Sequence, residues 1–368
     1  MASAQTSPAK INRIAILGTG PVSMLKAIFL AKANPLNQIT LIDSGKQIGG
    51  AWYSDKSPKG FEIECGCHIW SYVPTAYRYI EKELGIQLYP MKPNALFIVK
   101  KLRVPYSIKN SVDTYKAFFK LTFGFKWNKF KALKNHPDTN FRLISKKNKY
   151  PKTGSPELIH ALEKKINSLS QITILLNTSI ESISVDDFVN FNLNQTRVEF
   201  DQLLMTYVSQ IKSVEAFGKH IEIGVRKVDY IHFLIQFNKP LKKKLSYWRL
   251  MNDPIIHRIT DISYQTNFNE NLILVGIKGD AYHSKSEDEL FNHVKKILNQ
   301  YKLTDDSFQT EKIKTHIFPT HYLDNPSLEK LEPLRDKITL MYTTDFMHGI
   351  HFLLQGEKKL ISSAIALT

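Results

Sequence analysis

The sequence predicts an α/β protein in which a parallel sheet forms one domain and a second α+β domain is threaded through it. Three observations lead to this prediction. The chain has 368 residues, of which 43% are hydrophobic, enough for more than one core. Residues 12–43 follow a strand–helix–strand pattern, and separate apolar strands recur near residues 230 and 272. Two Cys in 42.4 kDa exclude a disulfide scaffold.

The strand–helix–strand unit has its parts in a fixed order. Residues 14–17, IAIL, are a short apolar run that ends at Gly18, as in a strand buried on both faces. Apolar residues then recur at helical spacing over 24–30. The segment QITLID adds a second apolar strand and ends in Asp43, 25 residues after Gly18. This order predicts a βαβ unit with parallel strands.

The glycines of this unit indicate dinucleotide binding. Gly18 permits a tight turn, Gly20 lets the backbone approach a pyrophosphate, and the following helix N-terminus offers free N–H groups. Asp43 is placed to accept ribose hydroxyls. Ser23 stands where the usual G-x-G-x-x-G pattern has its third glycine, which weakens the match. The alternative is a Rossmann-like unit that has lost its ligand.

A second glycine pair distinguishes between cofactors. Gly49 and Gly50 follow the second strand and resemble the double-glycine motif of glutathione-reductase-type FAD proteins, although the pair is also compatible with an ordinary turn. After the βαβ unit, the pair favours FAD over NAD. The residues expected to contact FAD in this half of the chain are Gly18, Gly20, Pro21, Val22, Ser23, Asp43, Ser44, Gly49, Gly50, Ala51 and Trp52.

Later segments extend the resemblance. The sequence GCHIW, with His68, resembles the G-x-H-I-aromatic segment of UDP-galactopyranose mutases, and 150–183 is similar to a segment shared by mutases, amine oxidases and protoporphyrinogen oxidases. The C-terminal stretch resembles their closing motif. The resemblance implies that His68 lies near the flavin as a catalytic residue and that Asp345 binds the ribityl chain. It also implies that the backbone around Gly349, Ile350 and His351 approaches the flavin ring.

The function implied by this resemblance is redox chemistry on a flavin. The leading hypothesis is an FAD-dependent oxidoreductase that acts on a small or medium organic substrate. The chain lacks the mutases' segments that hold the UDP diphosphate and the sugar, which argues against UDP-galactose. Two alternatives remain: a redox-neutral, mutase-like enzyme acting on a sugar nucleotide, and a flavin-fold protein without catalysis that binds an anionic partner or a membrane.

Arginine, cysteine and histidine residues elsewhere in the chain are further candidates for chemistry. Arg258 resembles an Arg of the second domain in these proteins and is a catalytic-site candidate that binds an anionic substrate group, with an ordinary salt bridge as the alternative. Cys65 and Cys67, at i and i+2, are expected to be packing thiols. His316 and His321 lack the partners of a metallohydrolase. We expect no metal.

Charge is concentrated in one segment. The net charge is +16, from 50 Lys and Arg against 34 Asp and Glu, and residues 100–152 alone hold 15 Lys and Arg against two acids. Aromatic residues lie among these lysines, a composition found in helices at membrane surfaces. The segment predicts either peripheral contact with an anionic membrane, or a cap helix with a solvated lysine face. Nucleic-acid binding lacks a recognised module.

These observations lead to an expected organisation. Residues 1–10 are expected to be a flexible tail without the features of a secretory signal, and the protein is expected to be cytoplasmic. The predicted domain ranges are 11–60, 150–215 and 333–368 for a discontinuous FAD-binding domain and 61–149 and 216–332 for the substrate or cap domain. The segments YIHFLIQF and NLILVGI are predicted strands of the second domain.

Overall fold

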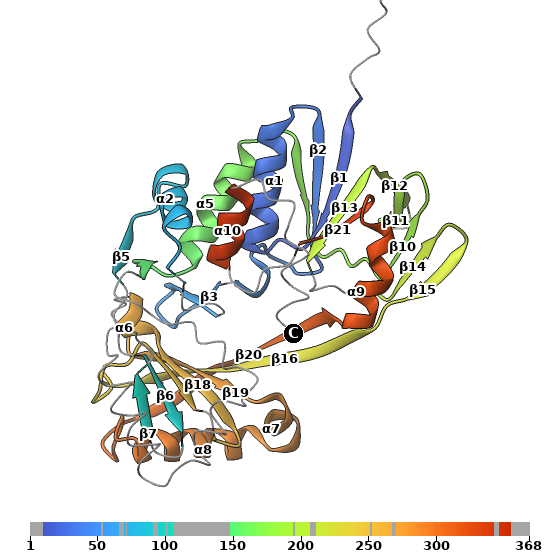
Figure 1. Ribbon diagram of the computed structural model, residues 1–368. Helices are drawn as coiled ribbons and strands as arrows, with labels where there is room; N and C mark the ends of the chain where they lie inside the picture. The colour runs from blue at the N-terminus through green and yellow to red at the C-terminus, as the bar shows by residue number, and fades with distance from the viewer. Residues whose placement is uncertain are drawn as a thin grey trace, which may run out of the picture. The chain divides into compact units, whose positions relative to one another are not determined.

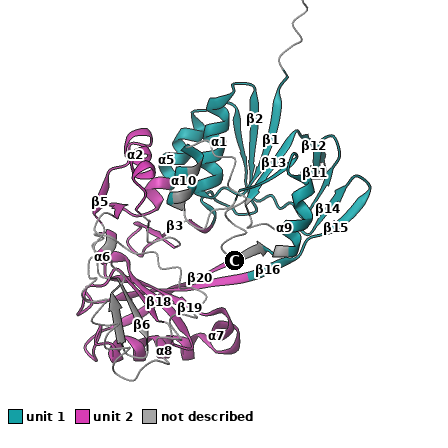
Figure 2. Cartoon of the chain, viewed as in Figure 1, with its two compact units in different colours: residues 1–50, 159–227, 320–368 teal, residues 51–158, 228–319 magenta. Residues whose placement is uncertain are grey.

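The computed structural model divides into two compact units (Figures 1 and 2). It describes residues 10–52, 54–65, 70, 72–90, 95–99, 102–105, 148–193, 196–206, 211–250, 252–266, 270–341 and 346–354. Unit 1 comprises 1–50, 159–227 and 320–368, and unit 2 comprises 51–158 and 228–319. Each unit is discontinuous in sequence. The boundaries of the units lie 9 to 13 residues from the predicted ones, with 159–227 in place of 150–215, for example.

Unit 1 is built on a five-stranded parallel sheet with the order β21-β13-β1-β2-β9. Its strands are β1 (Asn12–Leu17), β2 (Asn37–Ile42), β9 (Ile172–Leu175), β13 (Gln202–Thr206) and β21 (Ile338–Met341). Helix α1 (Pro21–Ala33) connects β1 to β2, and β13 lies on the other side of β1. The strand order therefore reverses beside β1, which is where open α/β sheets bind ligands at their carboxyl ends.

Helices flank this sheet. Helix α10 (Phe346–Leu354) lies beside α1, and α5 (Pro156–Asn167) precedes β9 (Figure 1). Helix α1 buries Met24, Leu25 and Ile28 completely. The apolar spacing predicted for residues 24–30 is thus the buried side of a helix, and burial of such side chains is the main force that holds it on the sheet.

Unit 1 has a second five-stranded sheet, with the order β12-β11-β10-β14-β15. The strands are β10 (Ser182–Val185), β11 (Val189–Leu193), β12 (Thr196–Phe200), β14 (Ser213–Ala216) and β15 (Lys219–Glu222). Helix α9 (Asn325–Leu331) and the 3-10 helix η3 (Glu332–Leu334) contribute Leu331 and Leu334 to the core shared by the two sheets.

Unit 2 contains a seven-stranded sheet with the order β20-β16-β19-β18-β17-β6-β7. Its strands are β6 (Ala95–Val99), β7 (Leu102–Pro105), β16 (Val225–Phe237), β17 (Tyr247–Leu250), β18 (Ile256–Asp261), β19 (Leu272–Ile277) and β20 (Thr310–Leu323). The predicted strands YIHFLIQF and NLILVGI are β16 and β19, which pair antiparallel. Both predictions are confirmed.

One face of the unit 2 sheet carries a large core, and the other face carries a smaller one that includes Leu234, Leu272 and Leu274. Helix α8 (Glu287–Gln300) packs its buried Leu290, Val294 and Ile297 among Phe233, Ile259 and other apolar residues of the strands. The helix begins with a capping box, in which Ser286 and Glu289 bond to each other's backbone N–H groups. Two short helices, α6 (Ile262–Thr266) and α7 (Gly279–Ser284), precede and follow β19. Because residues alternate along a strand, the neighbours of the core residues face the opposite side of the sheet.

Smaller elements complete unit 2. They are η1 (Gly50–Trp52), β3 (Ser54–Lys56) paired with β4 (Glu62–Glu64), α2 (Pro74–Glu83), and β5 (Leu88–Pro90) paired with β8 (Lys149–Pro151). Glu64 is 1% exposed and accepts hydrogen bonds from Tyr150 Oη at 2.5 Å and from the Ser155 N–H at 2.8 Å. These bonds anchor the turn before α5.

The predicted fold class is confirmed: the chain is α/β, with a parallel sheet in one unit and a mixed sheet in the other. Most of the basic segment 100–152 lies outside the described residues, so its prediction stays a prediction. Among the helices that the structure describes, none is long and apolar enough to cross a membrane.

Candidate functional site

The first feature of the candidate site is the glycine loop between β1 and α1. Gly18 follows β1 directly with φ +92°, a conformation that favours glycine, and its N–H donates to the Ile42 carbonyl at 2.7 Å. No described atom lies within 4 Å of the position that a Cβ on Gly20 would occupy. Ser23 is 2% exposed and packs beneath the loop. The loop thus has open space at Gly20 and a small buried residue at the third glycine position.

Helix α1 begins at this open space. Gly20 is its N-cap residue, with Pro21 at the first helical position. Within the described part of the chain, no side chain caps α1, and its first turn contains no acidic residue. The first N–H groups of a helix have no partner within the helix. The N-terminus of α1 therefore offers donors and a positive dipole to a phosphate group.

Asp43 connects the glycine loop to the end of β2. Its Oδ2 accepts hydrogen bonds from the N–H and the hydroxyl of Thr19, at 2.7 and 2.6 Å, and its Oδ1 accepts from the Gly45 N–H at 2.7 Å. These bonds occupy three of the about four acceptor positions of a carboxylate. One position on Oδ1 is left for a ribose hydroxyl. The sequence did not single out Thr19, which is fully buried; its signal is a hydroxyl next to the first glycine.

The glycine pair packs against the same loop. Gly49 and Gly50 have φ +106° and +55°, and the Gly49 N–H donates to the Thr19 carbonyl at 3.1 Å. A Cβ on Gly50 would lie 3.4 Å from the Cα of Gly20. The pair thus lets its own loop approach the glycine loop closely, and its expected contact with FAD stays a prediction. Ala51 and Trp52 follow in η1.

The C-terminal candidates lie on α10. This helix begins at Phe346, so Ile350 and His351 lie beyond its first turn, where N–H groups bond within the helix. Gly349 and Ile350 are buried. The expected approach of the backbone at 349–351 to a flavin stays a prediction. Asp345 and His68 lie outside the described residues, so their roles stay predictions.

Arg258 lies in a row of polar residues on the unit 2 sheet, on the face opposite α8. His232 of β16 pairs with Gly276 of β19, Gly276 with Arg258 of β18, and Arg258 with Arg249 of β17. Arg258 Nη2 lies 2.6 Å from His232 Nε2. Since a guanidinium only donates, His232 accepts through Nε2 and is neutral. The sequence missed His232 as a partner because the pairing depends on the order of the strands.

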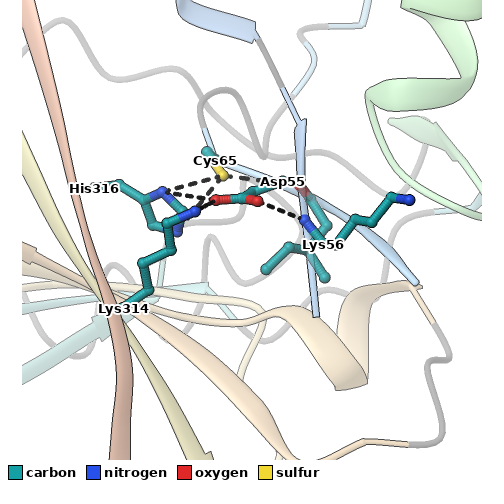
Figure 3. A network of polar contacts seen from close by, with 6 residues as sticks. Asp55, Lys56, Cys65, Lys314 and His316 are labelled. Atoms are coloured by element: carbon teal, nitrogen blue, oxygen red, sulfur yellow. Dashed lines mark hydrogen bonds and ion pairs between the residues drawn. The ribbon is translucent and has the colours of Figure 1, made fainter. Parts of the chain in front are cut away.

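A second polar network joins the β3–β4 hairpin to β20 (Figure 3). Asp55 of β3 forms an ion pair with Lys314, lies 3.5 Å from His316 Nδ1 and accepts the Lys56 N–H at 2.8 Å. Cys65 Sγ lies 3.9 Å from the His316 ring nitrogens and is fully buried, as expected of a packing thiol.

The protonation of this network argues against nucleophilic catalysis. Burial raises the pKa of the Cys65 thiol, and the nearby Asp55 carboxylate adds to the effect. Burial also lowers the pKa of His316, partly opposed by Asp55. Burial would raise the pKa of Asp55 as well, but the Lys314 ammonium and the hydrogen bond from the Lys56 N–H together lower that pKa. A neutral thiol is a poor nucleophile, so the network is a structural anchor for the hairpin.

Among the described residues, no three His, Cys, Asp or Glu side chains form a group that could hold a metal ion. His316 is buried in β20, where it belongs to the Cys65 network, and the side chain of His321 is not described.

Comparisons with known proteins agree with this geometry. Residues 16–82 match the model of the NAD(P)-binding Rossmann-like domain. A search of curated protein sequences found no significant match. Among solved structures, reduced UDP-galactopyranose mutase is similar with a TM-score of 0.70 at 13% identity, covering 96% of each chain.

Two further structures have the same fold. A protein from an Exiguobacterium species, provisionally assigned as a protoporphyrinogen oxidase, has a TM-score of 0.64 at 14% identity and covers 94% of this chain and 98% of its own. Putrescine oxidase bound to putrescine has a TM-score of 0.58 at 13% identity, covering 88% of this chain and 90% of its own. The chain therefore has the Rossmann-like fold of FAD- and NAD(P)-binding flavoproteins. The fold predicted from the sequence resemblance is confirmed.

Proposed function

We propose that the protein binds FAD and is an oxidoreductase that acts on a small or medium organic substrate. The observation that carries the proposal is the open N-terminus of α1 at the strand-order reversal, with Gly20 facing open space and Asp43 beside it. Parallel sheets bind dinucleotides at this position.

The described residues fit such a cofactor. The α1 N-terminus would bind the pyrophosphate, and the remaining acceptor position of Asp43 would bind a ribose hydroxyl. The Gly49–Gly50 pair and the similarity of almost the whole chain to flavoprotein structures favour FAD over NAD(P). Bound FAD would supply the hydride acceptor, while the protein binds and orients both reactants.

The chain's own residues would contribute substrate recognition and proton transfer. Arg258, held by His232, would bind an anionic group of the substrate. His68 would exchange a proton near neutral pH, as its resemblance to the mutase segment implies. The roles of Arg258 and His68 can be tested separately from FAD binding, because these residues do not belong to the glycine loop that would bind the cofactor.

A redox-neutral, mutase-like reaction is the second candidate, supported by the TM-score of 0.70 to reduced UDP-galactopyranose mutase. The two functions differ in their electron balance. An oxidoreductase passes electrons from the substrate to an acceptor in each turnover, whereas a mutase-like enzyme turns over only while its flavin is kept reduced and consumes no acceptor. Protein that fails to bind flavin would instead favour a non-catalytic role.

An absorption spectrum of the purified protein tests FAD binding. Protein-bound oxidised flavin absorbs at roughly 370 and 450 nm, and heat-released FAD identifies the cofactor. Gly20→Val should abolish these bands. Because Gly20 has φ −62° and open space around its Cβ position, the variant should fold, with a stability change within about 1 kcal/mol. Colourless wild-type protein that also fails to bind added FAD would overturn the proposal.

A matched variant makes the test sharper. Gly20→Asn places a favourable N-cap residue at the same position and should keep or increase the stability of the apoprotein while it still obstructs the pyrophosphate. Retention of full flavin content by both variants would show that FAD does not contact this loop.

A further inference from the structure

The strongest unassigned feature is the polar row on the unit 2 sheet, described above by His232, Gly276, Arg258 and Arg249. Two arginines stand directly opposite each other on neighbouring strands, since Arg249 pairs with Arg258. Like charges in directly opposed positions destabilise a sheet. Departures from the rules of sheet stability are expected at functional sites.

A β-bulge adds a third side chain to this face. The pairing of β18 with β19 shifts between Ile256 and Arg258, which leaves His257 as the extra residue. A Cβ on Gly276 would lie 2.4 Å from His257 Nε2 and 2.8 Å from Arg258 Cγ. The absence of a side chain at Gly276 therefore makes room for His257 and Arg258 on the same face. Bulges of this kind redirect side chains beside functional sites.

The surroundings of His257 are cationic. Burial, together with the charges of Arg258, Arg249 and Lys278, lowers the pKa of His257 to about 3. The Lys278 ammonium lies at the end of β19 and donates to the Asp253 carbonyl at 2.6 Å. The Asp253 carboxylate accepts from two backbone N–H groups and contacts His293 at 3.0 Å. Among the described residues, the charges that act on the pKa of His257 are thus all cationic.

The row is also held in place for binding. The neighbouring row, Phe233, Val275, Ile259 and Trp248, is buried against α8, so the strands beneath the arginines are fixed. His232, 2% exposed, fixes one nitrogen of the Arg258 guanidinium. Arg249, His257 and Arg258 are each partly exposed, so none of the three is closed off completely from solvent.

From this arrangement we propose that Arg249, His257 and Arg258 form a binding site for a phosphoryl group. Two guanidinium forks on adjacent strands and an imidazole present donors in several directions, which suits an anion with three or four oxygens better than a planar carboxylate. The inference deepens the proposed function, on which its role as a substrate site rests; the binding of phosphate itself does not depend on flavin.

The test uses the full chain carrying Gly20→Val, so that phosphate cannot occupy the α1 N-terminus. Inorganic phosphate is titrated by calorimetry at constant ionic strength, with acetate as the comparison ligand, and the His257 ring signals are followed by NMR. Phosphate should bind at least 10-fold more tightly than acetate and shift the His257 signals. Equal binding of the two anions, or an unmoved His257, would overturn the proposal.

Four variants separate the site from general positive charge. Arg258→Gln and Arg249→Gln should each weaken phosphate binding about 10-fold or more, whereas Arg226→Gln, at an exposed position of β16, should leave it unchanged. Arg258→Lys keeps the positive charge but loses the planar pair of guanidinium donors, so it should bind phosphate more weakly than the wild type. Equal weakening by Arg226→Gln would refute a specific site.

The flavin spectrum keeps the two proposals distinguishable. Arg258→Gln in the otherwise native chain should keep its flavin, because the residue belongs to unit 2 and not to the glycine loop. If the wild-type protein is colourless, fails to bind added FAD and still binds phosphate, the phosphoryl site is supported and only the FAD proposal is overturned. If the protein contains flavin but does not bind phosphate, the FAD proposal is supported and the phosphoryl site is overturned.

Discussion

Replacement of Asp43 by Asn isolates the contribution of one carboxylate to unit 1. An Asn oxygen can still accept from the Thr19 N–H and hydroxyl, but these bonds lose the charge, at about 1 kcal/mol each. The Asn amino group would then face the Gly45 N–H, so that bond is lost at a further cost of about 1 kcal/mol. Because Asp43 is partly exposed, we expect a total loss of about 2 kcal/mol.

Thermal unfolding of the flavin-free protein measures this loss. A cost of about 2 kcal/mol in a unit of this size should lower the unfolding midpoint by about 4 to 8 °C. Asp187→Asn makes the same chemical change at an exposed position and should move the midpoint by less than about 1 °C. Identical midpoints for Asp43→Asn and the wild type would refute the assignment of Asp43 as the link between the loop and β2. The variant should also bind FAD about 10-fold more weakly, because its ribose acceptor is changed.

Three further predictions concern other parts of the chain. Phe217 is 69% exposed in a two-residue hairpin turn and has φ +49°, a conformation that Asn adopts more easily than Phe. Phe217→Asn should therefore raise the stability of the protein by about 1 kcal/mol in chemical denaturation, and a decrease would contradict the prediction. The folded-state pKa of His257, about 3, lies below its unfolded value, so the stability of the protein should fall as the pH drops from 6.5 towards 3. His257→Gln should reduce the slope of stability against pH by about 1 kcal/mol per pH unit, and parallel pH profiles of the variant and the wild type would contradict this prediction. Replacing four lysines of the basic segment with Gln should reduce co-sedimentation with anionic vesicles; the lysines are Lys126, Lys129, Lys131 and Lys134. Equal recovery of the wild type with anionic and neutral vesicles would contradict membrane binding and favour the interpretation of these lysines as a solvated face.

Features that depend on neighbouring residues could be predicted from the sequence. Gly18, Gly20 and Asp43 were identified because a strand, a turn, a helix and a second strand follow one another within about 30 residues. The structure gives Gly18 the positive φ that the motif requires. The strands β16 and β19 were also predicted, because a buried strand reads as an apolar run without knowledge of its partners.

Features that join distant segments were decided by the tertiary structure. Cys65 and His316 are 251 positions apart, and Arg258 meets His232 only because β19 lies between their strands. The sequence by itself determined the dinucleotide-binding unit, because its chemistry arises from backbone groups and from glycines placed by local spacing. The strand order and one bulge decided which arginines and histidines share a face. A shift of one residue in strand pairing turns every side chain to the other side of the sheet, and local spacing does not specify that register.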